Sequence, residues 1–207
     1  MTNEPTVFVV DDDPALCESL CYLLKSDGLA AEAYTSAEDF LAAFDPDRPG
    51  VLVLDVRMRG MKGPELQEHL IEKDIDVPII ILTGHGDVPM AVRAVKAGAL
   101  DFLQKPVNDE ILLARIRQAI QLDQQNRQRR IEADSVAKRV ALLTGREREV
   151  LDLLLAAKAS KQMAHELCVS EKTIEVHRKH VLKKMEVNSA VELVRTVLSA
   201  RETKRKP

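Results

Sequence analysis

The first 120 residues alternate between short apolar runs and helical patterns, and this alternation restricts the fold more than any other feature of the chain. The central runs are rich in β-branched residues, as in strands that are buried on both faces. The runs lie at 7–10, 30–34, 51–54, 79–82 and 101–104. Such alternation predicts a parallel sheet with helices on both faces. We expect an α/β fold with a five-stranded, doubly wound sheet in the order 2-1-3-4-5.

Polar side chains stand at the ends of four of these predicted strands. Asp11 and Asp12 follow the first strand, and Asp55 follows the third. Thr83 ends the fourth strand, and Lys105 lies just beyond the fifth. Ligands of doubly wound sheets bind outside the carboxyl ends of the strands. These side chains are therefore expected to converge on one edge of the sheet.

The chemistry of this edge favours phosphoryl transfer to Asp55. Neighbouring carboxylates repel one another, and a divalent cation that keeps several waters, such as Mg²⁺, relieves the repulsion. Lys105 and Thr83 can then offset the charge of a phosphoryl group on an Asp55 oxygen. The alternative is that the acidic residues only cap the helices that follow them.

The net charge of −3 conceals two halves of opposite sign. Residues 1–122 carry 11 Lys and Arg against 21 Asp and Glu, a balance of −10, whereas residues 123–207 carry 19 against 12, a balance of +7. This asymmetry suggests two domains with different partners. The basic half is the candidate for nucleic acid, because phosphate neutralisation dominates that affinity.

Cellular location is constrained by three absences in the sequence. No apolar run approaches the roughly 18 residues of a membrane span, and the N-terminal segment lacks the pattern of a secretory signal. The three cysteines are odd in number and have no metal-ligand spacing, which fits free thiols. We therefore expect a protein of the reducing cytoplasm with no membrane partner.

The segment between the two halves contains neither Pro nor Gly from residue 107 to residue 144. Its middle, QLDQQNRQRR at 121–130, is polar all round, and apolar residues occur only at its flanks. This pattern predicts an extended, solvated helix between two domains. A coiled-coil partner and a flexible tether are the alternatives, although the apolar seam of a coiled coil lapses over 123–130.

The basic half shows helical patterns and no convincing strand. Thr144 and Glu147 form a capping box that opens one helix, and a short helix follows it. A three-residue turn at 168–170 then precedes a helix over 171–185 that has one apolar and one basic side. This arrangement indicates a helix-turn-helix whose second helix enters the major groove. A basic face that is merely solvated is the alternative.

The first half resembles the receiver domain of two-component response regulators. The motifs that carry the resemblance are VVDDDP, LDVRMRGMKGPEL and ILTGHGDVPMAVRAVKAGALDFLQKP. The resemblance implies a phospho-acceptor at Asp55. It also implies a Mg²⁺ ion held by Asp12, Asp55 and the backbone carbonyl of Arg57, with Asp11 placing its water ligands.

The same resemblance assigns roles at the other strand ends. It implies switch and phosphate-pairing roles for Thr83 and Lys105, and it matches Phe102 to an aromatic switch position. A core aromatic is the alternative for Phe102. The resemblance further implies a cis peptide bond before Pro106. One departure is Arg59, which replaces the usual proline and adds a cation near the pocket.

The second half is similar throughout to LuxR-type DNA-binding domains, over LTGREREVLDLLLAAKASKQMAHELCVSEKTIEVHRKHVLKKMEVNSAVELV. The resemblance places Glu175, Val176 and Lys179 at the positions that face the groove. It places another set among the phosphate contacts, which position a protein on DNA without specifying sequence: Lys161, Lys172, Thr173 and Arg178.

Several residues of the second half depart from that family pattern. Gly145 replaces the usual proline, and three residues stand where glycine is common: Ala157, Cys168 and Glu186. At Cys168 we expect the turn to require a positive φ, which strains any residue with a Cβ.

Together the halves resemble a response regulator of the NarL/FixJ class, closest to the FixJ branch. We expect a receiver domain over 5–120, a helical linker over 121–140 and a LuxR-type helix-turn-helix domain over 141–203. The implied function is a transcriptional regulator, whose only catalysis is phosphoryl transfer to Asp55 and hydrolysis from it. The implied partners are a sensor histidine kinase, promoter DNA with two half-sites, and a second copy of the chain when phosphorylated.

Two other functions remain open from the residues alone. A phosphatase with an aspartyl nucleophile would need a second Asp two positions after the nucleophile, where this chain has Arg57. A phosphorelay carrier or adaptor would leave the basic helix-turn-helix without a use.

Overall fold

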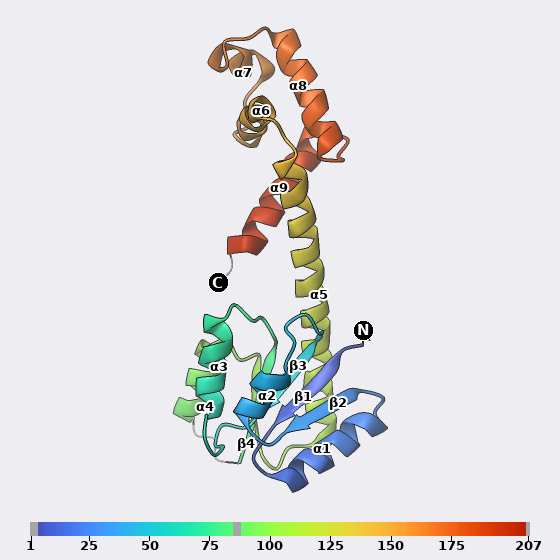
Figure 1. The fold of residues 1–207 in the computed structure, drawn as a ribbon, viewed down its shortest axis with the longest axis vertical. Helices are drawn as coiled ribbons and strands as arrows, with labels where there is room; N and C mark the ends of the chain where they lie inside the picture. The colour runs from blue at the N-terminus through green and yellow to red at the C-terminus, as the bar shows by residue number, and fades with distance from the viewer. Residues whose placement is uncertain (1–3, 85–87, 206–207) are drawn as a thin grey trace. The chain divides into compact units, whose positions relative to one another are not determined.

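The computed structural model describes residues 4–84 and 88–205, and the chain divides into two compact units, Met1–Asn126 and Arg127–Pro207 (Figure 1). The strands of the first unit are β1 (Thr6–Val10), β2 (Ala30–Tyr34), β3 (Gly50–Leu54), β4 (Ile79–Thr83) and β5 (Asp101–Gln104). Its helices are α1 (Pro14–Ser26), α2 (Ala37–Ala43), α3 (Gly63–Glu72), α4 (Val88–Lys96) and the first part of α5 (Asp109–Ala141).

The strands form one parallel sheet in the order β2-β1-β3-β4-β5, which confirms the predicted fold class and strand order. Strands β1, β3 and β4 are buried along their whole length, as their continuous apolar runs require. Gly50 opens β3 where β1 approaches closely, since a Cβ there would lie 2.1 Å from the Thr6 carbonyl oxygen.

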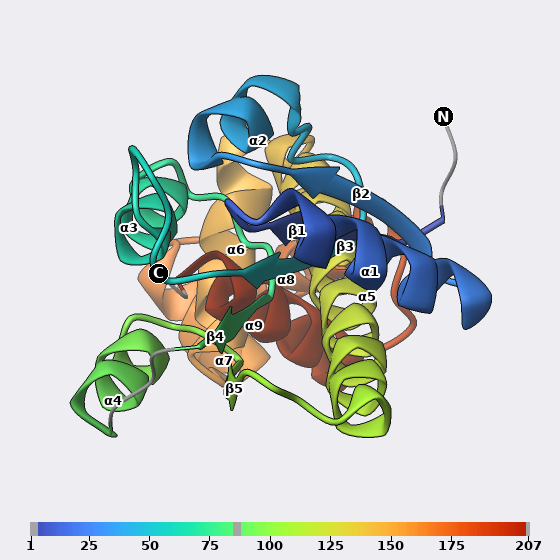
Figure 2. The ribbon, with the colours of Figure 1, turned by 90° about the horizontal axis from the view of Figure 1, so that it is seen from below.

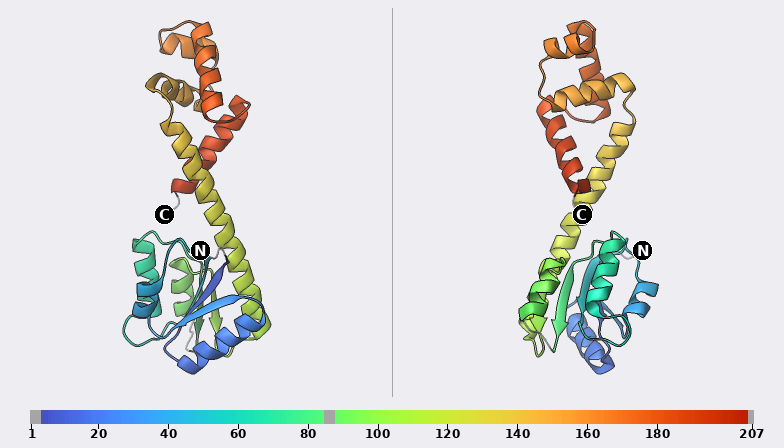
Figure 3. Two further views of the ribbon diagram at one scale, coloured as in Figure 1. Left: turned by 45° about the vertical axis from the view of Figure 1, so that its right-hand side comes forward. Right: turned by 90° about the vertical axis from the view of Figure 1, so that its left-hand side faces the viewer.

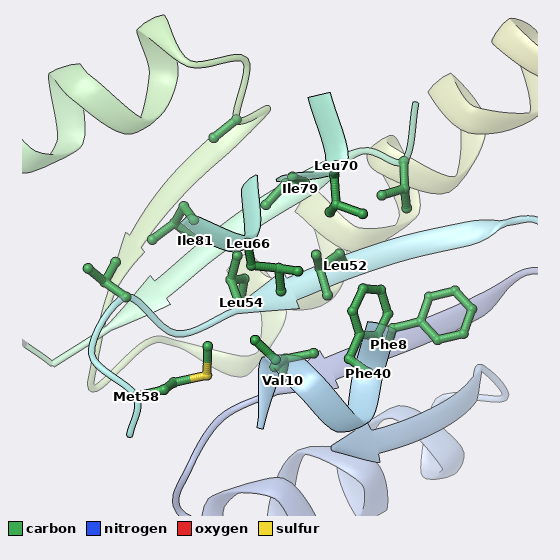
Figure 4. Close-up of a cluster of buried hydrophobic side chains, with 14 residues drawn as sticks. Phe8, Val10, Phe40, Leu52, Leu54, Met58, Leu66, Leu70, Ile79 and Ile81 are labelled. Atoms are coloured by element: carbon green, nitrogen blue, oxygen red, sulfur yellow. The ribbon is translucent and has the colours of Figure 1, made fainter. Parts of the chain in front are cut away.

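Helices cover both faces of the sheet (Figure 2). One face packs against α2, α3 and α4 through a cluster that includes Phe8, Phe40, Leu52, Leu66 and Leu70 (Figure 4). The rings of Phe8 and Phe40 meet edge to face at 5.9 Å. The other face packs against α1 and the first turns of α5. Two apolar layers therefore fix the sheet, and its carboxyl edge holds the polar residues.

Helix α5 is a continuous helix of 33 residues, which confirms the long helix predicted after the receiver. Leu112 and Ile116 pack against the sheet, whereas Val136 belongs to the core of the second unit. The polar middle is not solvated throughout, however. Asp123 is only 1% exposed and accepts a hydrogen bond from the Gly50 N–H at 2.9 Å. The buried N–H at the start of β3 needs a hydrogen-bond acceptor, and this explains why the Asp123 carboxylate is buried there.

The second unit contains helices α6 (Gly145–Leu155), α7 (Ser160–Glu166), α8 (Glu171–Lys184) and α9 (Ala190–Arg205), drawn in orange to red in Figure 3. Val150, Ile174, Val181 and Leu193 are buried in its core. Thr144 caps α6 in the predicted capping box with Glu147, and Ser170 caps α8 through the Thr173 N–H. In the described residues, no helix is long and apolar enough to cross a membrane.

Three helices of the second unit end on a residue in the left-handed conformation. The φ angles are +54° at Ala157, +53° at Cys168 and +55° at Glu186. These are the positions at which this chain lacks the glycine common in the resembling family. The positive φ expected at Cys168 is therefore present, and the same strained conformation occurs at two further helix ends.

Candidate functional site

The paired strands β1 and β3 place two carboxylates side by side. Val10 is in register with Leu54, so that Asp11 and Asp55 each leave the sheet at the next position. Both residues are buried, Asp11 at 4% exposure and Asp55 at 6%. Because a buried carboxylate needs a partner to remain charged, this edge requires a nearby cation.

Lys105 supplies that cation from the loop after β5. Its Nζ donates to Asp11 Oδ2 at 2.5 Å and to Asp55 Oδ1 at 2.9 Å. The peptide bond from Lys105 to Pro106 is cis, in agreement with the resemblance. Thr83 ends β4 at 1% exposure, and its carbonyl oxygen accepts from the Lys105 N–H at 2.9 Å. Residues far apart in sequence thus meet at one strand edge.

One cation shared by two carboxylates leaves an excess of negative charge at this edge. Burial raises the pKa of the Asp11 carboxyl, with the hydrogen bond from Lys105 opposing the effect. Burial alone would lower the pKa of Lys105, but its hydrogen bonds to Asp11 and Asp55 raise the pKa above its ordinary value. The site can therefore accommodate further positive charge.

The loop after β3 engages the remaining carboxylate oxygens. The Arg57 N–H donates to Asp55 Oδ2 at 2.6 Å. Asp12 is half-buried, and its Oδ2 accepts from the Arg59 N–H at 3.3 Å and lies 3.9 Å from the Arg59 guanidinium. Glu38, on α2, accepts from the Met61 N–H at 3.0 Å. Carboxylates from the segment after β1, from the end of β3 and from α2 thus hold this loop.

The donors at this edge limit which metals could bind. Among residues 4–84 and 88–205, no three acidic, His or Cys side chains are grouped so as to hold a metal. An ion here would thus take few side-chain ligands and complete its shell with backbone oxygen and water. That requirement fits Mg²⁺, which keeps several waters, and it does not fit a dehydrated all-protein site.

Phe102 lies on β5 and is half-buried. It packs at the margin of the apolar cluster between the sheet and helices α2 to α4. This partial burial is compatible with both predicted roles of Phe102, a core aromatic and a ring that can rearrange.

Helix α8 presents its predicted DNA-contacting residues to different degrees. Lys172, Glu175, Val176 and Lys179 are exposed, as is Lys161 on α7. Two others have intramolecular partners: Thr173 is half-buried and bonded to the Ser170 hydroxyl, and Arg178 donates to Ser160 Oγ at 2.6 Å. Arg178 thus joins α8 to α7, which a sequence pattern alone does not reveal.

Another buried carboxylate, Glu147 on α6, lies beside the C-terminal end of α8. Glu147 is 4% exposed, accepts from the Thr144 N–H at 2.8 Å, and pairs with Lys184 at 2.7 Å. His180 Nδ1 lies 3.9 Å from its other oxygen. The hydrogen bond from Lys184, together with the Thr144 N–H, lowers the Glu147 pKa to about 2.

Three residues of these networks were missed by sequence reasoning. Asp123 appeared to belong to a polar stretch, Glu38 to the first turn of a surface helix, and Glu147 only to a capping box. Their partners lie 73, 23 and 37 positions away. No local periodicity carries such information.

Comparison with known proteins defines the class of the chain. Residues 7–117 match the response regulator receiver domain, and residues 141–197 match the bacterial regulatory proteins of the luxR family. The chain belongs to the response regulators that combine a receiver with a LuxR-type DNA-binding domain, and it is a transcriptional regulator of that family.

Particular relatives extend over nearly the whole chain. The transcriptional regulatory protein FixJ of Azorhizobium caulinodans is 44% identical over 97% of this chain and 95% of its own. The response regulator protein TodT of Pseudomonas putida is 42% identical over 91% of this chain and 83% of its own. The solved structure of the response regulator StyR is 45% identical, with a TM-score of 0.81, over 94% of this chain and 98% of its own.

Proposed function

We propose that this regulator is switched by phosphorylation of Asp55 by a sensor histidine kinase. The observation that carries the proposal is the bridge from Lys105 to both Asp11 and Asp55 at the carboxyl edge of the sheet. A buried carboxylate held charged by a neighbouring lysine is available as a nucleophile. Its environment also offers a positive charge to an incoming phosphoryl group.

The phosphoryl transfer balances with groups that the chain and the kinase supply. An Asp55 oxygen attacks the phosphorus of a phosphohistidine, the P–N bond breaks, and the histidine nitrogen keeps the bonding electron pair and takes up a proton. Water later attacks the same phosphorus, which returns Asp55 and releases inorganic phosphate. Lys105 and the Thr83 hydroxyl would bind the phosphoryl oxygens in both steps.

Mg²⁺ is the cofactor that these residues would hold. Asp12, Asp55 and the backbone carbonyl of Arg57 would be its ligands, with Asp11 orienting bound waters. When bound, the ion supplies positive charge that stabilises the equatorial oxygens of the transferring group. The excess of carboxylate over lysine charge at this edge supports the assignment.

The switch would act through dimerisation of the receiver. Val92 and Val95 on α4 are exposed apolar residues at 46% and 53%. Movement of Thr83 and Phe102 toward the phosphoryl group would reshape the face made by α4 and β5. A few kcal/mol of differential binding is enough to shift such an equilibrium.

The DNA-binding unit would then be presented twice to two half-sites about one helical turn apart. We assign the receiver to 5–120, the helical linker to 121–140 and the DNA-binding domain to 141–203. Cys17, Cys21 and Cys168 are free thiols, which supports the reducing cytoplasm as the location.

Phosphorylation is tested by intact-mass measurement after treatment with a small-molecule phospho-donor and Mg²⁺. The wild-type chain should gain one base-labile phosphoryl group, and Asp55→Asn should gain none. Phosphorylated wild type should also sediment as a dimer and bind promoter DNA more tightly than Asp55→Asn. Equal labelling of both proteins would contradict the assignment of Asp55.

The DNA contacts are tested by titrating variants against the preferred duplex and a scrambled one at several salt concentrations. Replacing Lys172 by alanine should weaken binding to both duplexes alike and reduce the salt slope by about one per lost contact. Replacing Glu175 by alanine should cost roughly 1–3 kcal/mol per half-site on the preferred duplex only. An equal loss on both duplexes for Glu175→Ala would exclude Glu175 as a base contact.

A further inference from the structure

Arg59 contacts Asp12 through two different groups. Its backbone N–H donates to Asp12 Oδ2 at 3.3 Å, and its guanidinium Nε lies 3.9 Å from the same oxygen. The side chain of Asp12 is 30% exposed, whereas that of Arg59 is 96% exposed. Asp12 therefore belongs to the candidate site, whereas the exposed guanidinium of Arg59 can move away from it.

We infer that Arg59 competes with Mg²⁺ for Asp12 and so raises the concentration of Mg²⁺ that the receiver needs. This inference rests on the proposed Mg²⁺ site. An ion that binds Asp12 Oδ2 must share the negative charge of that oxygen with the N–H of Arg59 and must displace its guanidinium. Arg59 is thus a positioning residue that sets the occupancy of the site and takes no part in the phosphoryl transfer.

The surrounding loop keeps Arg59 near Asp12. Two residues before Arg59, the Arg57 N–H is held by Asp55; two residues after it, the Met61 N–H is held by Glu38. Gly60 lies between, at φ +72°, where an added Cβ would come within 2.8 Å of a Glu38 oxygen. The backbone of the loop is therefore fixed on both sides of Arg59, which leaves its side chain as the adjustable part.

The size of the effect follows from the exposure of the guanidinium. Exposed ion pairs contribute little and are screened by salt. We expect removal of the guanidinium to tighten Mg²⁺ binding by about threefold at low ionic strength, with the difference fading in high salt. Removal of the N–H as well should bring the total to about tenfold, since hydrogen bonds to charged acceptors are stronger than neutral ones.

The test is a Mg²⁺ titration of the full chain without any phospho-donor. Binding is measured by calorimetry and by the backbone amide signals of the β1–α1 and β3–α3 loops. Arg59→Ala removes the guanidinium with its side chain and keeps the backbone N–H, whereas Arg59→Pro removes both groups. Lys62→Ala is the matched control, because it removes the same charge from an exposed residue of the same loop. Asp12→Asn reports whether the ion uses the proposed site.

The expected order of Mg²⁺ affinity is Arg59→Pro above Arg59→Ala, with Lys62→Ala close to wild type and Asp12→Asn weakest. If wild type binds through Asp12 and Arg59→Ala binds no more tightly, the inference is overturned while the proposed Mg²⁺ site stands. Equal tightening by Arg59→Ala and Lys62→Ala would also overturn it, because the general field of the loop would then be the cause. A wild-type chain that binds no Mg²⁺ at millimolar concentrations would overturn both.

Discussion

Each unit of the chain contains a buried carboxylate paired with a lysine, and the two pairs differ in charge balance. In the first unit, Asp11 and Asp55 share Lys105. In the second, Glu147 accepts from both Lys184 and the Thr144 N–H. The pKa of Asp11 is raised, whereas that of Glu147 is lowered to about 2.

The difference teaches how to distinguish a working site from a structural pair. Two carboxylates with one cation remain short of positive charge, so that an ion or a phosphoryl group with its metal can enter with a gain in free energy. One carboxylate with several donors is already satisfied and only stabilises the fold. The presence of a buried ion pair therefore does not by itself identify a functional site. The balance of charge around the pair is the more informative property.

The largest expected effect is the destabilisation of the second unit by Glu147→Ala. This change removes the reciprocal cap of α6 and the partner of Lys184, and we expect a loss of about 2 kcal/mol in the free energy of unfolding. Hydrogen exchange of the amides in α6 and α8, measured on the full chain, would show it.

The control for this change is Glu149→Ala on the same helix. Glu149 pairs with Arg146 at 2.7 Å on the exposed surface, and such a pair contributes less than about 0.5 kcal/mol. If the two variants lose equal stability, the buried, doubly bonded Glu147 is no more stabilising than an exposed ion pair, and the comparison between the two units fails.

The pH dependence of Glu147 has a definite sign. Because its pKa is lowered in the folded state, its stabilisation is fully present above about pH 4.5 and is lost as the pH falls toward about 2. The stability of the second unit should thus decrease over this range, and Glu147→Gln should flatten the decrease. Acid unfolding followed by the amide signals of α8 measures it.

An effect of opposite sign and smaller size is expected for Asp11→Asn. The substitution removes one of two carboxylates that compete for Lys105 and leaves that lysine to Asp55. The one amide oxygen can still accept from the Asp13 N–H, which Asp11 Oδ1 does at 3.1 Å, while the bond from Lys105 to Oδ2 is lost. In metal-free buffer at neutral pH we expect the first unit to gain on the order of 1 kcal/mol. Denaturant unfolding in the presence of a chelator measures the gain.

The pH dependence of stability that Asp11 causes should be opposite to that of Glu147. Because the pKa of Asp11 is raised in the folded state, the first unit should gain stability as the pH falls through that folded pKa, above the ordinary 3.8. Asp11→Asn should abolish this gain. Asp13→Asn is the control, since Asp13 is exposed and asparagine caps a helix as well as aspartate does. A destabilised Asp11→Asn protein in metal-free buffer would refute the charge-excess argument.

The sheet order and the helices were predictable because their signals are local. The apolar runs of β1, β3 and β4, the cap at Thr144, and the turn before α8 are each encoded in a few consecutive residues. The strand-end rule then brought Asp11, Asp55 and Lys105 together without any structure. The resemblance to known families added their individual roles.

What could not be predicted depends on contacts between distant segments. Asp123 is buried because it accepts from the Gly50 N–H at the start of β3. Arg178 is held by its hydrogen bond to Ser160 on the preceding helix. The hold of Glu38 on the loop after β3 is of the same kind. Composition and periodicity describe each segment, whereas these side chains are placed by the packing of one segment against another.

The smallest effects concern the ends of helices, where the two units again differ. In the first unit, α1 and α4 end on Gly28 and Gly98 with positive φ, whereas in the second α6 and α7 end on Ala157 and Cys168 in the same conformation. Each end closes with the same backbone pattern, for example from the Val169 N–H to the Ala164 carbonyl at 3.0 Å. At these ends the second unit therefore retains strain that glycine removes from the first, although α3 of the first unit also ends on a non-glycine residue in this conformation, Asp74 at φ +55°.

Replacing Cys168 or Ala157 by glycine should stabilise the second unit by about 0.5–1 kcal/mol, because relief of roughly 1–2 kcal/mol of left-handed strain exceeds the added entropy of the unfolded chain. Cys168→Ala keeps the Cβ and should give no gain. Gly28→Ala tests the reverse, since nothing lies within 4 Å of its added Cβ and any loss must come from the backbone. Thermal unfolding of the full chain, with amide signals assigned to each unit, measures all of these changes. If Cys168→Ala stabilises as much as Cys168→Gly, the gain comes from loss of the thiol and the backbone explanation is wrong.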